Sequence, residues 1–244
     1  MMPADRPSDA TCRSAIVAAG RRLGARGLIF AGEGNLSLRL GDALLITPTG
    51  LRKDELEPDD LIVVPLAAED AAGASSRRAS SDLAIHRAVY AARTDVVAFV
   101  HAHLPAAMAL TLAGEVPDPA VLPETALLLP RVPFVPFADA GSDERAAAIA
   151  LALTQPPVPL ADVALLERHG AVAVGSREQA SAESEGAALD QAVNRLELLE
   201  VLCRTWRDAL LIRAAVPGRG GRTMLRPPSP APGRRREGDR GRQP

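Results

Sequence analysis

An uninterrupted apolar run at residues 96–100 constrains the fold of this chain more than any other feature of its sequence. Asp95 precedes the run and His101 follows it, and a short apolar run between polar neighbours is typical of a buried strand. A buried strand needs other elements to cover its sheet, so the segments around this run decide the fold class.

Those segments predict both helices and further strands. Apolar residues recur at helical spacing over residues 10–25, and helical periodicity runs almost without a break over residues 178–213. Between them, Asn35–Leu40 alternates polar and apolar residues, Gly41 and Asp42 form a turn signal, and Ala43–Ile46 is apolar again. This pattern predicts a β-hairpin.

Further elements are expected between the hairpin and the C-terminal helix. Ser80 or Ser81 is a plausible N-cap for a helix that follows them, and Pro105 can open another helix. Additional strands are predicted over residues 61–66, 132–137, 163–166 and 171–174, and an additional helix over residues 142–153 with Ser142 as its cap. Prolines confine the strand at residues 132–137 to a sheet edge or a terminus. Mixed helices and strands predict an α/β sandwich, but periodicity leaves the strand order open.

Length and composition predict one folded domain over residues 10–216, preceded by a flexible N-terminus at residues 1–9. Residues 217–244 are rich in Arg, Gly and Pro, and we expect this tail to be disordered. An Arg-rich tail could touch RNA or an acidic partner, but charge runs usually stay solvated. The formal net charge of −2 gives no global reason to expect nucleic acid as a partner.

The sequence also predicts the environment of the protein. No apolar run approaches the roughly 18 to 20 residues that a membrane span needs, and the first ten residues lack the apolar region of a signal peptide. A cytoplasmic protein without membrane contact is therefore expected. Cys12 and Cys203 lie far apart without CxxC spacing, which favours reduced packing residues.

Three of the four histidines lie where predicted strands end. On a strand the residues i and i+2 share a face, so the imidazoles of His101 and His103 can point at one ion. His169 precedes Gly170 in a tight connection that can bring a third imidazole to the same point. Three protein nitrogens and an open fourth position are typical of catalytic zinc. An HxH pair also occurs as two solvent-exposed histidines, so the pattern alone leaves both interpretations open.

Several segments, in a fixed order, match one known family. They are Gly34-Asn35-Leu36-Ser37-Leu38-Arg39, Leu45-Ile46-Thr47-Pro48-Thr49-Gly50, Ser80-Ser81-Asp82 with His86, His101-Ala102-His103, and Arg168-His169-Gly170-Ala171-Val172-Ala173-Val174-Gly175. Through them the chain resembles the class II aldolase/adducin family over about residues 14–208, and within it the L-fuculose-phosphate aldolases. The resemblance implies a three-layer α/β/α sandwich with a central, mostly antiparallel sheet.

The resemblance also implies a site and a reaction. His101, His103 and His169 would hold one zinc ion, or another divalent metal ion, per subunit in a homotetramer with active sites at subunit interfaces. The implied reaction is the reversible cleavage of a ketose 1-phosphate to dihydroxyacetone phosphate and an aldehyde. Zinc would stabilise the enediolate as a Lewis acid. A small-molecule sugar phosphate is therefore the expected partner.

Asp82 and six further residues match other functional positions of the family. Asp82 occupies the position of the catalytic glutamate, at a helix start whose dipole favours a carboxylate; it could also be only a helix-start residue. The matches to the phosphate-binding residues are Gly34, Asn35, Thr49, Gly50, Ser80 and Ser81. Their backbone N–H groups, hydroxyls and helix start suit an anion, although the same residue types serve ordinary turns and caps.

The sequence departs from the family at several positions. An aspartate at position 82 resembles the L-ribulose-5-phosphate 4-epimerases, whereas residues 46–50 resemble the aldolases. The only tyrosine, Tyr90, follows Asp82 on a helical pattern, and the family's C-terminal tyrosine is absent. Glu124 stands where another family tyrosine is found, and it is either a proton donor, a residue that approaches the metal, or a polar loop residue. His86 and Tyr90 are expected to be packing and supporting residues.

Three hypotheses follow for function. The first is a zinc-dependent aldolase acting on a ketose 1-phosphate such as a fuculose 1-phosphate. The second is a related enzyme: a sugar-phosphate 4-epimerase, decarboxylase or dehydratase. The third is a non-catalytic, adducin-like interaction domain, which the intact set of His101, His103 and His169 disfavours.

Overall fold

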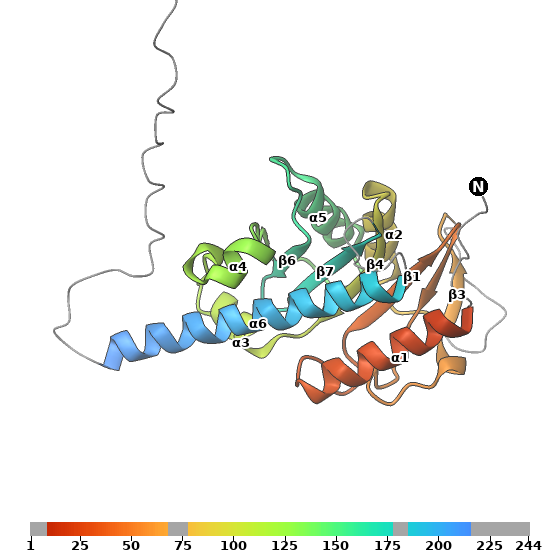
Figure 1. Cartoon of the computed structure of the whole chain (residues 1–244), viewed down its shortest axis with the longest axis horizontal. Coiled ribbons are helices and arrows are strands. Elements are labelled where there is room, and N and C mark those ends of the chain that lie inside the picture. Colours follow the sequence, from red (N-terminus) through yellow and green to blue (C-terminus); the bar gives the residue numbers. More distant parts are fainter. Residues whose placement is uncertain (1–8, 68–77, 178–184, 216–244) are drawn as a thin grey trace, which may run out of the picture.

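The computed structural model of the chain describes residues 9–67, 78–177 and 185–215. The predictions of helical structure over residues 178–184 and of a disordered tail over residues 217–244 therefore lie outside the described residues. So does the predicted flexible N-terminus, except for Asp9, which is the first residue of a helix. Figure 1 shows the arrangement of the described elements in sequence colours.

One seven-stranded sheet, in the order β3-β2-β1-β4-β7-β6-β5, forms the centre of the fold. Among the strand pairs of the described residues, only the pairing of β5 with β6 is parallel, so the prediction of a mostly antiparallel sheet is confirmed. The strands are β1 (Asn35–Leu40), β2 (Ala43–Ile46), β3 (Ile62–Pro65), β4 (Val96–Ala102), β5 (Phe134–Val135), β6 (Val163–Leu166) and β7 (Gly170–Ser176). The two-residue β5 lies at the edge, as its flanking prolines require.

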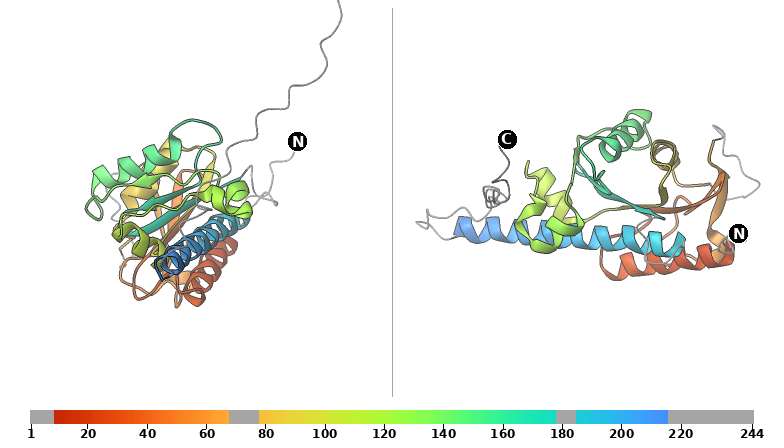
Figure 2. Two further views of the ribbon diagram at one scale, coloured as in Figure 1. Left: turned by 90° about the vertical axis from the view of Figure 1, so that its left-hand side faces the viewer. Right: turned by 45° about the horizontal axis from the view of Figure 1, so that its top comes forward.

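Helices cover both faces of this sheet. Helices α1 (Asp9–Ala25), α3 (Pro105–Leu112) and α6 (Glu185–Ala215) pack on one face, and α2 (Leu83–Ala92) and α5 (Asp143–Thr154) pack on the other. The right-hand view of Figure 2 shows the sheet between these two layers. The three-layer α/β/α sandwich is therefore confirmed.

Strand β4 lies in the middle of the sheet, and all seven of its residues are buried. Ala98, Val100 and Ala102 face the α1/α6 layer, while Val96 and Phe99 face the α2/α5 layer. His101 shares the parity of Phe99 and so belongs to the α2/α5 face. Burying a valine or phenylalanine fully contributes roughly 1.5–3 kcal/mol, which explains why this run fixes the centre of the fold.

Periodicity did not predict three short helices, each of which has proline as its first residue. They are η1 (Pro58–Asp60), η2 (Pro119–Val121) and α4 (Pro123–Leu128). Segments of three to six residues are too short to show a helical repeat. Glu124 consequently lies in the first turn of a short helix, and not in a loop.

The predicted N-cap of α2 was wrong. Asp82 occupies the N-cap position, and neither Ser80 nor Ser81 does. The Ser80 hydroxyl accepts a 3.3 Å hydrogen bond from the N–H of Asp82, and the Ser80 carbonyl accepts one of 3.1 Å from Leu83 N. These two bonds form a turn one residue before the helix, so the helix starts later than the serines suggested.

Other predictions from the sequence are confirmed. Ser142 caps α5 by accepting a hydrogen bond of 3.2 Å from Arg145 N. Cys12 and Cys203 are buried free thiols. None of the helices within residues 9–67, 78–177 and 185–215 is long and apolar enough to cross a membrane.

Candidate metal centre and active-site cleft

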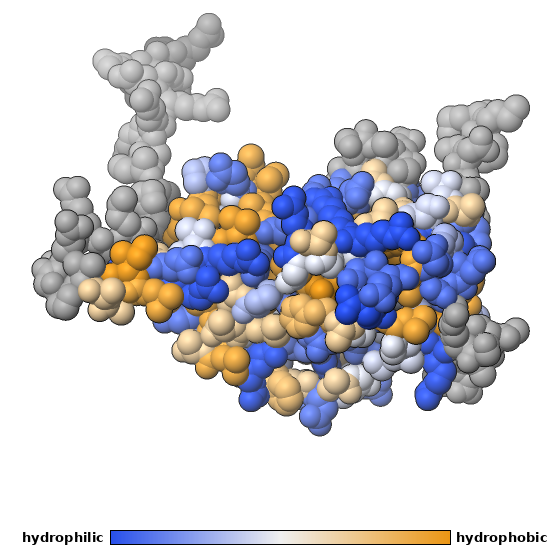
Figure 3. All heavy atoms as spheres, turned by 90° about the horizontal axis from the view of Figure 1, so that it is seen from below, coloured by the Kyte–Doolittle hydropathy of each residue, from blue (hydrophilic) through white to orange (hydrophobic). Residues whose placement is uncertain are grey.

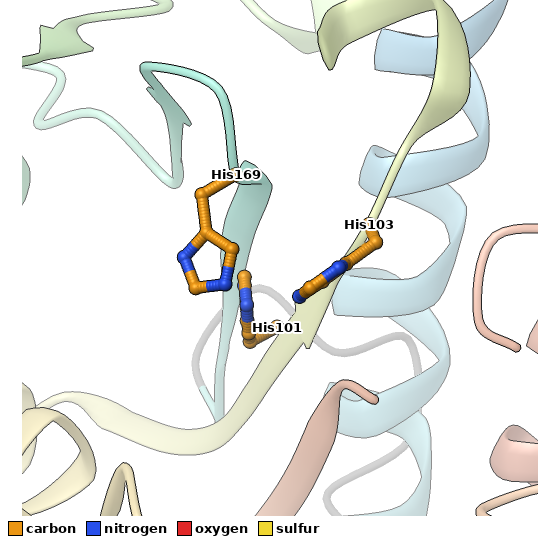
Figure 4. A group of neighbouring side chains, drawn as sticks. All are labelled: His101, His103 and His169. Atoms are coloured by element: carbon orange, nitrogen blue, oxygen red, sulfur yellow. The ribbon is translucent and has the colours of Figure 1, made fainter. Parts of the chain in front are cut away.

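Three histidine rings from two neighbouring strands meet at one end of the sheet. Strand β4 carries His101, its continuation carries His103, and the turn before β7 carries His169. The ring centroids lie 4.5 to 4.9 Å apart, and Figure 4 shows the three rings turned toward a common point. The predicted convergence of these three side chains is thus present in the fold.

Two glycines allow the chain to approach these histidines closely. A Cβ atom on Gly170 would lie 2.2 Å from the Ala102 carbonyl oxygen, and one on Gly34 would lie 2.9 Å from the His101 carbonyl oxygen. Both glycines also have positive φ angles, +82° and +70°, which L side chains rarely adopt. Gly170 therefore sets the path of the turn that carries His169.

Hydrogen bonds orient the first two rings. Nδ1 of His101 donates to the Ala171 carbonyl at 3.0 Å, and its buried Nε2 has no hydrogen-bond partner among the described residues. His103 places Nδ1 3.0 Å from Oε2 of Glu33. Because the Nδ1 atoms are occupied by acceptors, the Nε2 lone pairs are left for a metal, and such outer partners are typical of metal-bound histidine.

Burial and nearby positive charge favour the neutral form of His101 and His103. Burial, and then the neighbouring His103, hold the pKa of His101 well below its usual value. Burial, followed by the positive charge of Arg145, lowers the pKa of His103. Neutral imidazole is the form that binds a metal ion.

The residues fit a zinc ion. The ligand atoms of His101, His103 and His169 all lie within 4.8 Å of one another. Nitrogens bound tetrahedrally to zinc at about 2.1 Å lie about 3.4 Å apart, a spacing that small ring rotations reach. The unpartnered Nε2 of His101 is the atom that such a metal would satisfy.

The histidines line a cleft of about 170 Å³ together with most of the predicted phosphate-binding residues. The predicted site residues that line it are Gly34, Asn35, Thr49, Ser80, Ser81, Asp82, His101, His103 and His169. Gly50 lies just outside this lining, next to Gly32, and Glu124 is exposed on α4. The fold thus gathers nine of the eleven candidate residues at one place.

Backbone contacts join the two polar segments of this cleft. Thr49 N donates to the Arg78 carbonyl at 3.0 Å, and Ser80 N donates to the Thr47 carbonyl at 3.1 Å. An isolated β-bridge pairs Pro48 with Ala79 in the same stretch. These bonds hold the Thr49 turn beside the serines although about thirty residues separate them in the sequence.

A chain of buried hydrogen bonds ends at Asp82. Asn35 Nδ2 donates to Asp82 Oδ2 at 2.9 Å, and Asn35 Oδ1 lies 2.7 Å from Nε2 of His86. Nδ1 of His86 lies 2.7 Å from the Ser37 hydroxyl, which in turn contacts the Tyr90 hydroxyl at 2.9 Å. Because Asn35 Oδ1 can only accept, His86 carries its proton on Nε2 and accepts from Ser37 at Nδ1.

This network defines the roles of His86 and Tyr90, which the sequence analysis expected only to be packing and supporting residues. Complete burial lowers the pKa of His86 to about 3, so its ring is a neutral connector. Burial raises the pKa of Tyr90. Both residues support the cleft from behind, as expected. The Asn35 amide is bonded at both ends, so only its second Nδ2 hydrogen remains for a substrate.

Sequence reasoning missed two buried cations near the cleft. Lys53 lines it and donates from Nζ to the carbonyls of Gly32 at 2.8 Å and Leu51 at 2.6 Å. Arg145, in the first turn of α5, is also buried. Both lie among acidic neighbours in the sequence, a pattern that is typical of a solvated surface. Only their burial in the fold distinguishes them from ordinary surface cations.

The mostly antiparallel sheet between two helical layers is the fold of the class II aldolase family. Residues 14–207 match the class II aldolase and adducin N-terminal domain family, and the chain belongs to this family. The segments that carry the cleft, namely the Gly34 loop, the Ser80 turn and the histidines, all fall within the matched range.

Relatives in this family differ in their reactions. The chain is 37% identical over 79% of its length to a bifunctional methylthioribose-1-phosphate isomerase/methylthioribulose-1-phosphate dehydratase of Nocardia farcinica, of which it spans only 35%. It is 31% identical to a 3-oxo-tetronate 4-phosphate decarboxylase of Cupriavidus necator, over 90% of this chain and 96% of that one. The crystal structure of L-fuculose-1-phosphate aldolase from Thermus thermophilus superimposes with a TM-score of 0.73 at 32% identity, covering 85% of this chain and 98% of the other.

Proposed function

We propose that this protein is a zinc-dependent lyase acting on a phosphorylated keto sugar, and specifically an aldolase that cleaves a ketose 1-phosphate to dihydroxyacetone phosphate and an aldehyde. One observation carries the proposal: a metal-competent histidine cluster, a carboxylate and a cluster of anion-binding groups line a single cleft. A non-catalytic scaffold has no need for this combination.

His101, His103 and His169 would hold the metal through one ring nitrogen each. A bound zinc ion supplies a Lewis acid for the negative charge that develops on oxygen when a carbon–carbon bond breaks. Glu33 and the Ala171 carbonyl hold two of the rings in the orientation that presents Nε2 to the ion.

Asp82 is the proposed proton carrier. It is buried at the wall of the cleft, and Asn35 holds one of its carboxylate oxygens by a hydrogen bond of 2.9 Å. The second oxygen has no such constraint from Asn35 and can accept a proton from a substrate hydroxyl. A positioned carboxylate of this kind contributes about 10²- to 10⁴-fold to rate.

Ser80, Ser81 and Thr49 are the proposed holders of the phosphate, with Gly34, Asn35 and Gly50 beside them. Ser80 and Ser81 lie just before Asp82, the N-cap of α2, and the ten residues of this helix direct the positive end of its dipole toward them. A phosphate fixed there would orient the reacting carbons relative to the metal and Asp82.

A cytoplasmic homotetramer with one zinc ion per subunit completes the proposal. Exposed apolar side chains support association, and Figure 3 shows them gathered toward the end of the molecule where α3, α4 and the last turns of α6 lie. The exposed residues include Leu112, Leu127, Leu128, Leu211 and Ile212. Glu124 is exposed on α4, so its proposed role as proton donor requires the cleft of a neighbouring subunit.

The names of the relatives favour a second type of candidate reaction, dehydration or decarboxylation of a related phosphorylated substrate.

One assay separates these reactions from aldol cleavage. The zinc-loaded protein is incubated with ketose 1-phosphates, 5-methylthioribulose 1-phosphate and 3-oxo-tetronate 4-phosphate, and dihydroxyacetone phosphate, carbon dioxide and the dehydrated product are measured. Dihydroxyacetone phosphate from a ketose 1-phosphate supports the aldolase, and either other product with no aldol cleavage rejects it.

A further inference from the structure

Arg145 is a buried cation whose charge the fold does not fully satisfy. Only 4% of this residue is exposed, and its Nη2 is buried without a hydrogen-bond partner in the described parts of the chain. A buried guanidinium with an unused donor is costly, because burial removes its hydration without replacing it. Such a group in a folded protein points to a partner that arrives from outside.

Arg145 lies behind the wall of the cleft and is not among the residues that line it. The segment that leads into α5 borders the cleft, since Ala140 lines it and a Cβ on Gly141 would lie 3.5 Å from the Ser81 carbonyl oxygen. Ser142 then caps the helix by accepting from Arg145 N. Arg145 therefore lies one helical turn behind residues that contact the proposed phosphate holders.

Electrostatic effects agree with this placement. The charge of Arg145 lowers the pKa of both His103 and His101, after the larger effect of burial. The carboxylate of Asp82 raises the pKa of Arg145, against the larger lowering that burial causes. Asp82 nevertheless receives its side-chain hydrogen bond from Asn35, so Arg145 is not its hydrogen-bonded counterion within the described chain.

The cleft and the layer behind it thus hold more positive groups than one phosphate requires. The proposed phosphate position already has hydroxyls, backbone N–H groups and a helix N-terminus, and Lys53 is bonded to two carbonyls. An additional, unsatisfied guanidinium suits a second anion, and its planar fork matches a carboxylate.

Resting on the proposed function, we infer that Arg145 binds a carboxylate of the substrate, so that the ketose 1-phosphate is also a sugar acid. Arginine pairing stabilises a carboxylate that keeps its charge. It therefore favours a carboxylate retained in the product over one that leaves as carbon dioxide.

The test compares two ligands that differ in one group, 3-phosphoglycerate and glycerol 3-phosphate. Their dissociation constants are measured by calorimetry on the full chain, both with zinc and after chelation, because a carboxylate can also bind a metal. The wild-type protein should bind 3-phosphoglycerate about tenfold or more tightly than glycerol 3-phosphate, as a charge-assisted pair predicts. Arg145→Met should remove this preference in both metal states and leave the affinity for glycerol 3-phosphate unchanged.

Two further variants control the comparison. Arg145→Lys keeps the charge but loses the fork, so it should retain only part of the preference. Arg21→Met removes an exposed arginine of α1 and should change neither affinity. The melting temperature of Arg145→Met should be equal to or higher than that of the wild type, because the variant removes an unsatisfied buried charge.

The outcomes separate this inference from the proposed function. Equal loss of affinity for both ligands in Arg145→Met would assign Arg145 to the phosphate, and an undiminished preference or a marked fall in melting temperature would give it a structural role. Each result overturns the inference. If the wild type binds glycerol 3-phosphate but gains nothing from the carboxylate, the inference alone fails; if it binds neither ester, the proposed function fails as well.

Discussion

Asn35 donates a hydrogen bond of 2.9 Å to Asp82, and Asn35 is also the β1 residue that lies opposite His101 in β4. One pair of adjacent strands therefore sets the position of a metal ligand and of the proposed proton carrier. Because the pairing register of two central strands is hard to shift, the separation of these two groups is built into the sheet.

Asp82→Asn should abolish most of the activity without loss of the fold. The new side chain has nearly the same shape and its Oδ1 can still accept from Asn35 Nδ2, but it cannot take up a proton. Turnover should fall at least about 10²-fold while the zinc content stays the same. Steady-state kinetics and metal analysis check this outcome, and unchanged turnover would remove Asp82 from the mechanism.

Replacing both Ser80 and Ser81 by alanine should weaken phosphorylated ligands far more than their unphosphorylated analogues. The variant loses two hydroxyls at the proposed phosphate position, and a hydrogen bond to a charged group contributes about 1.5–3 kcal/mol. Dissociation constants for glycerol 3-phosphate and glycerol measure the difference.

Ser142→Ala is the matched control for this pair, because Ser142 caps α5. It should cost about 1 kcal/mol of stability and leave phosphate affinity intact. Equal weakening of both ligands in the Ser80/Ser81 variant would show that these serines only shape the turn before α2.

His86 should make the folded protein sensitive to mild acid. Its pKa is about 3 in the fold and about 6.5 when unfolded, so between these values the unfolded chain binds more protons. Stability should therefore fall as pH decreases from about 6.5 toward 3, by about 2 kcal/mol at pH 5 from this residue.

The comparison with His86→Gln isolates this contribution. Glutamine can still donate to Asn35 Oδ1 but does not titrate, so the loss of stability between pH 7.5 and pH 5 should be smaller in the variant. Urea unfolding at the two pH values measures it. An identical pH dependence in both proteins would contradict the assigned state of His86.

Gly170→Ala should both destabilise the fold and weaken metal binding. The added Cβ would lie 2.2 Å from the Ala102 carbonyl oxygen, at a φ of +82°. Strain and overpacking together should lower the free energy of unfolding by about 2 kcal/mol or more.

Gly114→Ala is the control. Its φ is +75°, but a Cβ there meets open space, so the substitution should lower the free energy of unfolding by about 1 kcal/mol. Chemical unfolding of the two variants decides the point, and equal costs would contradict close packing at Gly170.

Much of this structure could be predicted from local patterns. The apolar run at residues 96–100 predicted the central strand, and the spacing of His101 and His103 predicted two rings on one face of it. The position of His169 beside these two rings followed from the resemblance to a family. It depends on the pairing of β4 with β7, whose residues lie about seventy apart in the sequence. Periodicity contains no information about such pairings.

Other features depend on burial, which the sequence does not display. Arg145 and Lys53 stand beside acidic residues in the sequence and predict a solvated surface, yet both are buried in the fold. The serines before α2 resembled caps, but a turn formed by Ser80 moved the helix start to Asp82. In each case the local sequence pattern indicated one role for the side chain, and the tertiary environment gave it a different role.

The zinc content of the purified protein tests the central claim most directly. After dialysis against metal-free buffer, the wild-type chain should retain about one zinc ion, and a strong chelator should remove it. His169→Ala should retain much less than one ion per chain, whereas His86→Gln, which alters a histidine outside the cluster, should retain the wild-type amount. A wild-type protein that binds no zinc, or a His169→Ala variant that binds as much as the wild type, would contradict the assignment of the three-histidine cluster as the metal centre.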